Sequence, residues 1–126
     1  MVPGVSSTTT GALFAGALGL YTGTIALIRS HALGAGVAQA LGPHRAVLLK
    51  NHGPVVTGKT IAECVVGAIM LENAAMVQLA VEAAGDPAPE FSPDDLAKLK
   101  SEIGQPEQFQ INFDYLVRRV QRRRGS

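Results

Sequence analysis

The sequence predicts an α/β fold in which two short antiparallel strands, about residues 45–51 and 54–57, are covered by helices. The first strand is indicated by four consecutive apolar residues after Arg45, a run typical of a strand buried on both faces. The tight connection Asn-His-Gly-Pro then leads into a second, shorter run, which indicates an antiparallel pair. A long segment without proline follows and predicts a helix.

The composition of the chain indicates how many domains it forms, which partners it binds and in which cellular compartment it works. The chain has 126 residues, enough for one small domain. It is 47% hydrophobic and 17% charged, so we expect a partner subunit or a missing part of the domain to cover some apolar surface. The net charge of +1 predicts no general affinity for nucleic acid or a membrane. Cys64 is the only cysteine, which excludes an internal disulfide and fits a reducing, cytoplasmic location.

The N-terminal segment, residues 1–20, is expected to be apolar and irregular. Its first ten residues offer little to pack, and for Gly11–Leu20 a short helix and a strand both remain open. Tyr21–Thr24 is typical of a turn. Gly11–Ile28 is apolar enough to raise a signal peptide or membrane span, but it has no positive n-region and is interrupted by glycines and threonines.

Two helices are expected on either side of the strand pair. Ser30 is a suitable N-cap for a helix from about His31 to Leu41, and Gly42-Pro43 ends it. Thr60 and Glu63 have capping-box spacing at the start of the long helix Ile61–Ala84. In that helix we expect Glu63, Asn73 and Glu82 to face outward, and the following residues to face inward: Ile61, Cys64, Val65, Ala68, Ile69, Leu71, Ala75 and Leu79.

Two further helices are expected near the C-terminus. Ser92 as N-cap, followed by proline and two acids, predicts a helix that runs to about Ile103 and ends at Gly104. Pro106 opens a last helix to about Arg124. Its apolar face is expected to comprise Phe109, Phe113, Leu116, Val117 and Val120. Five arginines make its end basic, either as a solvated terminus that suits the helix dipole or as an anion or subunit contact.

Residues 53–60 match the phosphate-loop pattern G-x-x-x-x-G-K-[ST], between a strand and a helix. In such a loop, backbone N–H groups, the lysine and the threonine hold a nucleotide and Mg²⁺. Three features oppose this hypothesis. Pro54 removes one N–H donor, Val55 and Val56 prefer an extended strand, and no later strand allows a parallel βαβ sheet. A P-loop nucleotide-binding protein is therefore the least favoured alternative.

A metal site is the competing hypothesis for the same stretch. His52 follows a buried strand at a tight turn, which would present the imidazole at the sheet edge. Catalytic metal sites normally take three protein ligands and keep one open position. His31 and His44 have no obvious route to the same point.

From Leu27 to Cys64 the chain is similar to the class II aldolase/adducin-like family. The resemblance is carried by a helix ending A-L-G, the strand R-A-V-L-L, the tripeptide N-H-G, a second strand, and a helix with Glu near its start. It extends over about residues 21–79, and more weakly to Val120. The resemblance implies a partial three-layer α/β/α class II aldolase-like domain. It also implies that the Gly-Lys-Thr merely opens the long helix.

The resemblance further implies a metal-dependent lyase. Family enzymes cleave or rearrange small hydroxylated acids and sugar phosphates through an enediolate or enolate, which a divalent metal such as Zn²⁺ or Mn²⁺ stabilises. By position, His52 matches the last of three histidine ligands, and Asn51 and Gly53 flank it as substrate-binding residues. The family's H-x-H pair and catalytic Glu lie upstream and have no counterpart in this chain. Residues 21–124 are therefore expected to correspond to the C-terminal half of the domain, with an incomplete metal site.

Two functional classes remain open from the sequence. The first is a fragment of a homo-oligomeric aldolase or decarboxylase acting on a small molecule. The second is a non-catalytic, adducin-like association module, since that branch of the family has the fold without the catalysis. A single histidine cannot hold a catalytic metal, so activity requires ligands from another chain.

Overall fold

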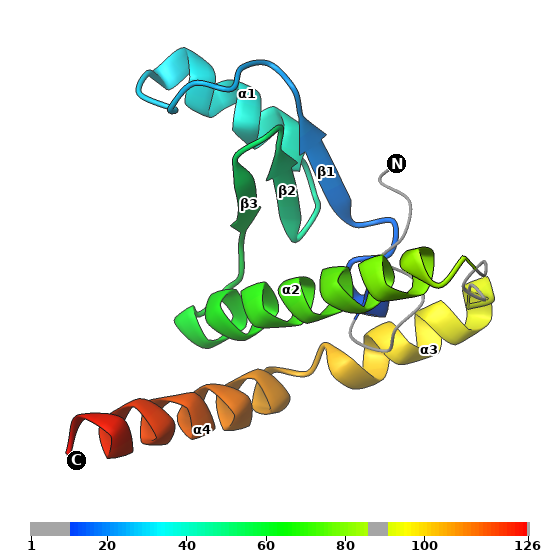
Figure 1. The fold of residues 1–126 in the computed structure, drawn as a ribbon, viewed down its shortest axis with the longest axis vertical. Coiled ribbons are helices and arrows are strands. Elements are labelled where there is room, and N and C mark those ends of the chain that lie inside the picture. Colours follow the sequence, from blue (N-terminus) through cyan, green and yellow to red (C-terminus); the bar gives the residue numbers. More distant parts are fainter. Residues whose placement is uncertain (1–10, 86–90, 126) are drawn as a thin grey trace.

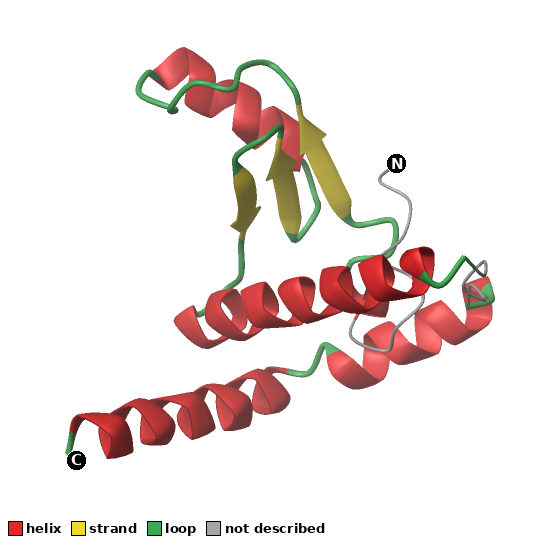
Figure 2. Cartoon of the chain, in the orientation of Figure 1, coloured by secondary structure: helices red, strands yellow, loops and turns green. Residues whose placement is uncertain are grey.

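The computed structural model describes residues 11–85 and 91–125, which form a mixed three-stranded sheet with helices packed around it (Figures 1 and 2). The α/β fold class predicted from the sequence is confirmed. In chain order the elements are η1 (Gly11–Leu13), β1 (Leu18–Tyr21), α1 (His31–Leu41), β2 (Ala46–Leu49), β3 (Gly53–Val56), α2 (Ile61–Ala83), α3 (Pro93–Ile103) and α4 (Pro106–Arg124).

The sheet has the strand order β1-β2-β3. β1 and β2 are parallel and are joined through α1, whereas β2 and β3 form an antiparallel hairpin. In the hairpin, Ala46 lies opposite Val56 and Leu49 lies opposite Gly53. The antiparallel pair is thus confirmed, but β2 is shorter than the expected 45–51 because Lys50, Asn51 and His52 form the turn.

β1 lies in the part of the chain for which we expected irregular structure. Gly11–Leu13 is a 3₁₀ helix and Leu18–Tyr21 is a strand, so both alternatives left open for Gly11–Leu20 occur. The irregular structure expected up to residue 20 is therefore wrong for residues 11–13 and 18–20. The expected turn at Tyr21–Thr24 is also wrong for Tyr21, which ends the strand. The strand forms by pairing with β2, and this contact between distant residues leaves no local sequence signal. Expectations for residues 1–10 lie outside the described part of the chain.

α1 packs against β1 and β2 with bounds equal to those predicted. The Ser30 hydroxyl accepts a hydrogen bond from the Leu33 N–H at 3.3 Å, as an N-cap does. Gly42, with φ 51°, ends the helix. β1 approaches α1 closely at Gly19, where an added Cβ would clash with the carbonyl oxygen of Ala40.

The start of α2 is confirmed, but the face that it buries is not the expected one. Glu63, expected outside, is only 9% exposed, and its carboxylate accepts a hydrogen bond from the Lys59 N–H at 2.9 Å. Conversely, Ile61 is 70% exposed and Leu79 is 67% exposed. α2 is apolar on both sides, so its sequence did not show which side would meet η1, β3 and α4. The residues that are buried are Ala62, Glu63, Val66, Gly67, Leu71 and Ala74.

The core lies where η1, the start of β2, α2 and α4 meet. Its fully buried members include Phe14 and Phe109, each 1% exposed, and Ala46. The Arg45 guanidinium lies over the Phe109 ring, 5.6 Å from its centroid. α3 packs on η1, and the Lys100 ammonium donates to the Ala15 carbonyl at 2.6 Å.

α4 has the predicted bounds, with an apolar face narrower than expected. Phe113 and Leu116 pack on the core, but Val117 is 37% exposed and Val120 is 50% exposed. Among the described residues, α2 is the one helix that is long and apolar enough to cross a membrane by length and composition. Core helices of globular domains meet the same criterion, and one face of α2 contributes to the core.

Candidate functional site

The carboxyl ends of the two parallel strands meet at one edge of the sheet. The Lys50 N–H, just after β2, donates to the Tyr21 carbonyl at the end of β1, at 2.9 Å. The turn after β2 and the loop after β1 therefore start side by side, far along the sheet from α2 (Figure 1). In α/β proteins, the region beyond the carboxyl ends of the strands is the usual place for ligand binding.

The turn between β2 and β3 carries the predicted site residues Asn51, His52 and Gly53. The His52 N–H donates to the Leu49 carbonyl at 3.0 Å, which closes the turn. Asn51 has φ 55°, a left-handed conformation that asparagine tolerates better than most residues. Asn51 and His52 are exposed and Gly53 is half-buried. The turn thus holds an imidazole and an amide on a fixed backbone at the sheet edge.

The loop after β1 adds residues that the sequence analysis did not assign to the site. Tyr21 is 9% exposed and packs closely on two glycines; a Cβ added to Gly23 would lie 2.7 Å from its hydroxyl, and one at Gly36 would lie 3.0 Å from its ring. The Thr24 hydroxyl accepts the Ala26 N–H at 3.0 Å. The loop follows a strand that runs parallel to β2 and so lies at the same edge of the sheet. Predicting β1 would have placed this loop there, but the sequence did not decide between a helix and a strand for that segment.

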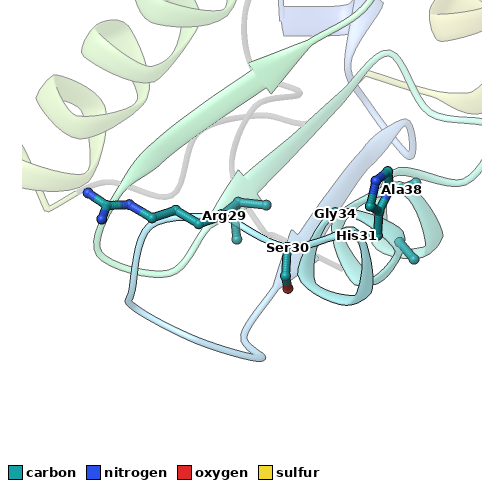
Figure 3. Close-up of a pocket in the computed structure, with 7 residues that line it drawn as sticks. Arg29, Ser30, His31, Gly34 and Ala38 are labelled. Atoms are coloured by element: carbon teal, nitrogen blue, oxygen red, sulfur yellow. The ribbon is translucent and has the colours of Figure 1, made fainter.

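An open pocket of about 560 Å³ lies at the start of α1 (Figure 3). Arg29 and His31 supply its ionisable side chains. In Figure 3 the Arg29 side chain extends away from α1, while the His31 ring lies beside the helix. The Ser30 hydroxyl is already used as the N-cap. The full lining is Ile28, Arg29, Ser30, His31, Gly34, Ala35 and Ala38.

The three histidines do not come together. His31 begins α1 and His52 lies in the β2–β3 turn, both toward the carboxyl ends of the parallel strands, whereas His44 precedes β2 at the opposite end. Within residues 11–85 and 91–125, no three His, Cys, Asp or Glu side chains are placed to hold a metal ion. His44 is thus separated from the His52 turn, whereas His31 lies toward the same end of the sheet.

The phosphate-loop hypothesis is wrong. The first four residues of the motif, Gly53–Val56, form strand β3 and therefore cannot wrap around a phosphate. The remaining residues form the N-cap of α2, where Thr60 Oγ1 accepts the Glu63 N–H at 3.1 Å. The Lys59 N–H is also occupied, since it donates to Glu63. Gly58 serves close packing, because a Cβ there would lie 2.6 Å from Cβ of Glu63.

A comparison with known families decides what kind of domain this is. Residues 5–79, more than half of the chain, match the model described as Class II Aldolase and Adducin N-terminal domain. The chain belongs to the class II aldolase and adducin family. The resemblance predicted from the N-H-G turn and its flanking elements is thereby confirmed.

Individual relatives of this class II aldolase-family chain agree with that result. The chain is 40% identical to Decarboxylase NovR from Streptomyces niveus over 63 residues, which is 50% of this chain and 23% of that protein. It superposes on L-fuculose 1-phosphate aldolase from Glaciozyma antarctica PI12 with a TM-score of 0.68 and 27% identity. That alignment covers 86% of this chain and 39% of the aldolase.

A second solved structure, an aldolase II superfamily protein from Pseudomonas syringae, gives a TM-score of 0.75 at 18% identity and supports the fold. That alignment covers 91% of this chain and 47% of the neighbour. The chain thus has the class II aldolase fold, and it spans less than half the length of these relatives. The described residues supply one exposed histidine at the expected turn and do not by themselves fit a metal site.

Proposed function

We propose that this chain supplies one edge of a class II aldolase-type lyase site, centred on the turn that carries His52. The reaction class is carbon–carbon cleavage, either retro-aldol cleavage or decarboxylation, of a small hydroxy or oxo acid or a sugar phosphate. The observation that carries the proposal is the exposed Asn51-His52-Gly53 turn beside the end of β1, in a chain of this family. The similarity to one decarboxylase and one sugar-phosphate aldolase supports both reactions.

The roles of the turn residues follow from their chemistry. His52 has an exposed imidazole at the edge of the sheet, where it would serve as one ligand of a Zn²⁺ or Mn²⁺ ion. The other ligands have to come from outside the described residues, because no group of three donors exists within them. The Asn51 amide and the half-buried Gly53 backbone would contact the substrate. We propose that an assembly in the cytoplasm completes the site.

Metal titration of the purified chain tests this proposal. Zn²⁺ and Mn²⁺ binding is measured by calorimetry for the wild type, His52→Ala and the control His44→Ala. The control removes a histidine at the opposite end of the sheet. We expect stoichiometric binding that is lost in His52→Ala and retained in His44→Ala. Equal binding by all three proteins would contradict the assignment of His52.

The second candidate function is an adducin-like association module without catalysis. Two observations favour it: the absence of a three-donor group in the described residues, and the extensive exposed apolar surface of α2. Absence of metal binding in every variant, together with no aldehyde or carbon dioxide release from sugar phosphates and oxo acids, would support this candidate over the lyase.

A further inference from the structure

The edge of the sheet that carries the His52 turn is positively charged. Lys50 begins this turn and Arg29 lies near the end of the loop after β1, and both residues are exposed. No aspartate or glutamate precedes Glu63 in the sequence. The acidic residues that the structure describes lie in α2, α3 and α4, toward the opposite end of the sheet (Figure 1). These carboxylates do not neutralise the charge at the edge, which therefore attracts anions.

The chain topology brings Arg29 to the same edge as the turn. α1 connects two parallel strands and packs on both, so it runs back along the sheet and begins beyond their carboxyl ends. The Lys50 N–H donates to the Tyr21 carbonyl at 2.9 Å, which holds the start of the loop 22–30 beside the turn. Arg29 directly precedes the N-cap of α1. A ligand at the His52 turn therefore lies on the edge of the sheet to which Arg29 also belongs.

Arg29 also lines the open pocket of about 560 Å³ at the start of α1. Apart from Ser30 and His31, the other residues of the lining are glycine, alanine and isoleucine. The Ser30 hydroxyl already caps the helix. The Arg29 side chain extends away from α1 (Figure 3), and within the part of the chain that the structure describes its guanidinium has no hydrogen-bond or ion-pair partner. Its N–H donors are thus available to a ligand.

A guanidinium in this position is suited to an oxyanion. Its planar fork of N–H donors matches the two oxygens of a carboxylate or of a phosphate, and such charge-assisted pairs are stronger than neutral hydrogen bonds. The substrate classes proposed above, small hydroxy or oxo acids and sugar phosphates, all carry such a group. The positive edge and the pocket therefore fit the charged end of these molecules, and a neutral polyol would not pair with Arg29.

We propose that Arg29 binds the carboxylate or phosphate group of the substrate and makes this edge of the sheet selective for anionic molecules. The identity of the ligand rests on the proposed function, whereas binding of an oxyanion requires neither the metal nor the reaction. Arg29 is thus a specificity-determining residue that acts beside the His52 turn. Lys50 and His31 flank it and add positive charge or hydrogen-bond donors at the same edge.

Titration of the full chain with inorganic phosphate and with glycolate, followed by ¹H–¹⁵N NMR at low ionic strength, tests this proposal. We expect the largest changes in amide shift at residues 29–31 and 50–52. Arg29→Met should weaken binding by at least about tenfold, because it removes a charge-assisted pair. Arg29 is exposed, so this variant should fold normally. The matched control is Arg118→Met, which removes an exposed arginine of α4 and should leave the affinity unchanged.

The two probes distinguish the possible sources of the oxyanion. Tighter binding of phosphate would support a sugar phosphate as substrate, and tighter binding of glycolate would support a small acid. The proposal would be overturned if neither anion bound to the wild type, or if the wild type and Arg29→Met bound equally well. Shifts centred on residues 118–124 would also overturn it, because they would place the anion at the basic end of α4.

Metal titration of the same samples separates this proposal from the lyase. Zn²⁺ binding that depends on His52, without oxyanion binding, would keep the lyase site and overturn the role of Arg29. Oxyanion binding that depends on Arg29, without metal binding, would keep Arg29 as an oxyanion site and count against the lyase.

Discussion

The two ends of β2 differ in burial and in chemistry. At the amino end, Ala46 and Val47 are 0% exposed, and Ala46 packs in the core with Phe109. At the carboxyl end, three residues past Val47, Lys50 is exposed at the start of the turn that carries His52. One short strand thus connects the buried core to an exposed turn of polar residues.

This difference separates stability from function along a single strand. Substitutions near the amino end of β2 change the free energy of unfolding, because they remove buried contacts. Substitutions in the turn leave packing intact and change only what the edge presents to a ligand. Large losses of stability from substitutions in the turn, or small losses from truncation of buried side chains, would contradict this difference between the two ends of β2.

The largest effect is expected from Phe109→Ala. The Phe109 side chain is 1% exposed and is one of the largest fully buried groups among the described residues, so its removal leaves a cavity. We expect a loss of about 3–5 kcal/mol in the free energy of unfolding. Urea denaturation measures it, with Ile111→Ala on the same helix as the control, expected to change stability by less than about 0.5 kcal/mol because Ile111 is 66% exposed. Similar losses in both variants would contradict the described core.

A smaller effect is expected where β1 meets α1. A Cβ at Gly19 would clash with the Ala40 carbonyl oxygen, so Gly19→Ala should cost about 1–3 kcal/mol. Gly34→Ala is the matched control within α1, where an added Cβ meets nothing within 4 Å. That substitution should stabilise the chain by about 0.5–1 kcal/mol, because alanine favours a helix more than glycine does. Thermal unfolding of both variants should therefore show shifts of opposite sign.

The sequence allowed elements with local signals to be predicted closely. Ser30, Thr60 and Ser92 each act as the expected N-cap, because capping depends on residues within one turn of the helix. The β2–β3 hairpin was predicted from its apolar run and tight connection. The turn with His52 could be identified as a candidate site for the same reason.

Two features could not be predicted because they depend on contacts between distant residues. β1 exists through its pairing with β2, about 28 residues later in the chain. The buried face of α2 is chosen by η1 and α4, and the helix is apolar enough that either face could have served. As a result, Ile61 and Leu79 were expected in the core and instead lie on the exposed side of α2. Because β1 was not predicted, the edge of the sheet where the carboxyl ends of β1 and β2 meet could not be predicted either.

The smallest effect on stability is expected in the turn itself, where Asn51→Gly gives the sharpest test. Asn51 has φ 55°, a conformation that glycine adopts without steric strain. The free energy of unfolding of Asn51→Gly should therefore lie within about 0.5 kcal/mol of the wild-type value. Asn51→Ala also removes the side-chain amide, but it should lower the free energy of unfolding by about 1 kcal/mol, because alanine is strained in the left-handed conformation. Urea denaturation separates the two. If Asn51 contacts substrate, both variants should lose the activity, or the ligand-induced stabilisation, of the assembled site to the same extent. A loss confined to Asn51→Ala would instead mean that the residue matters only for the shape of the turn.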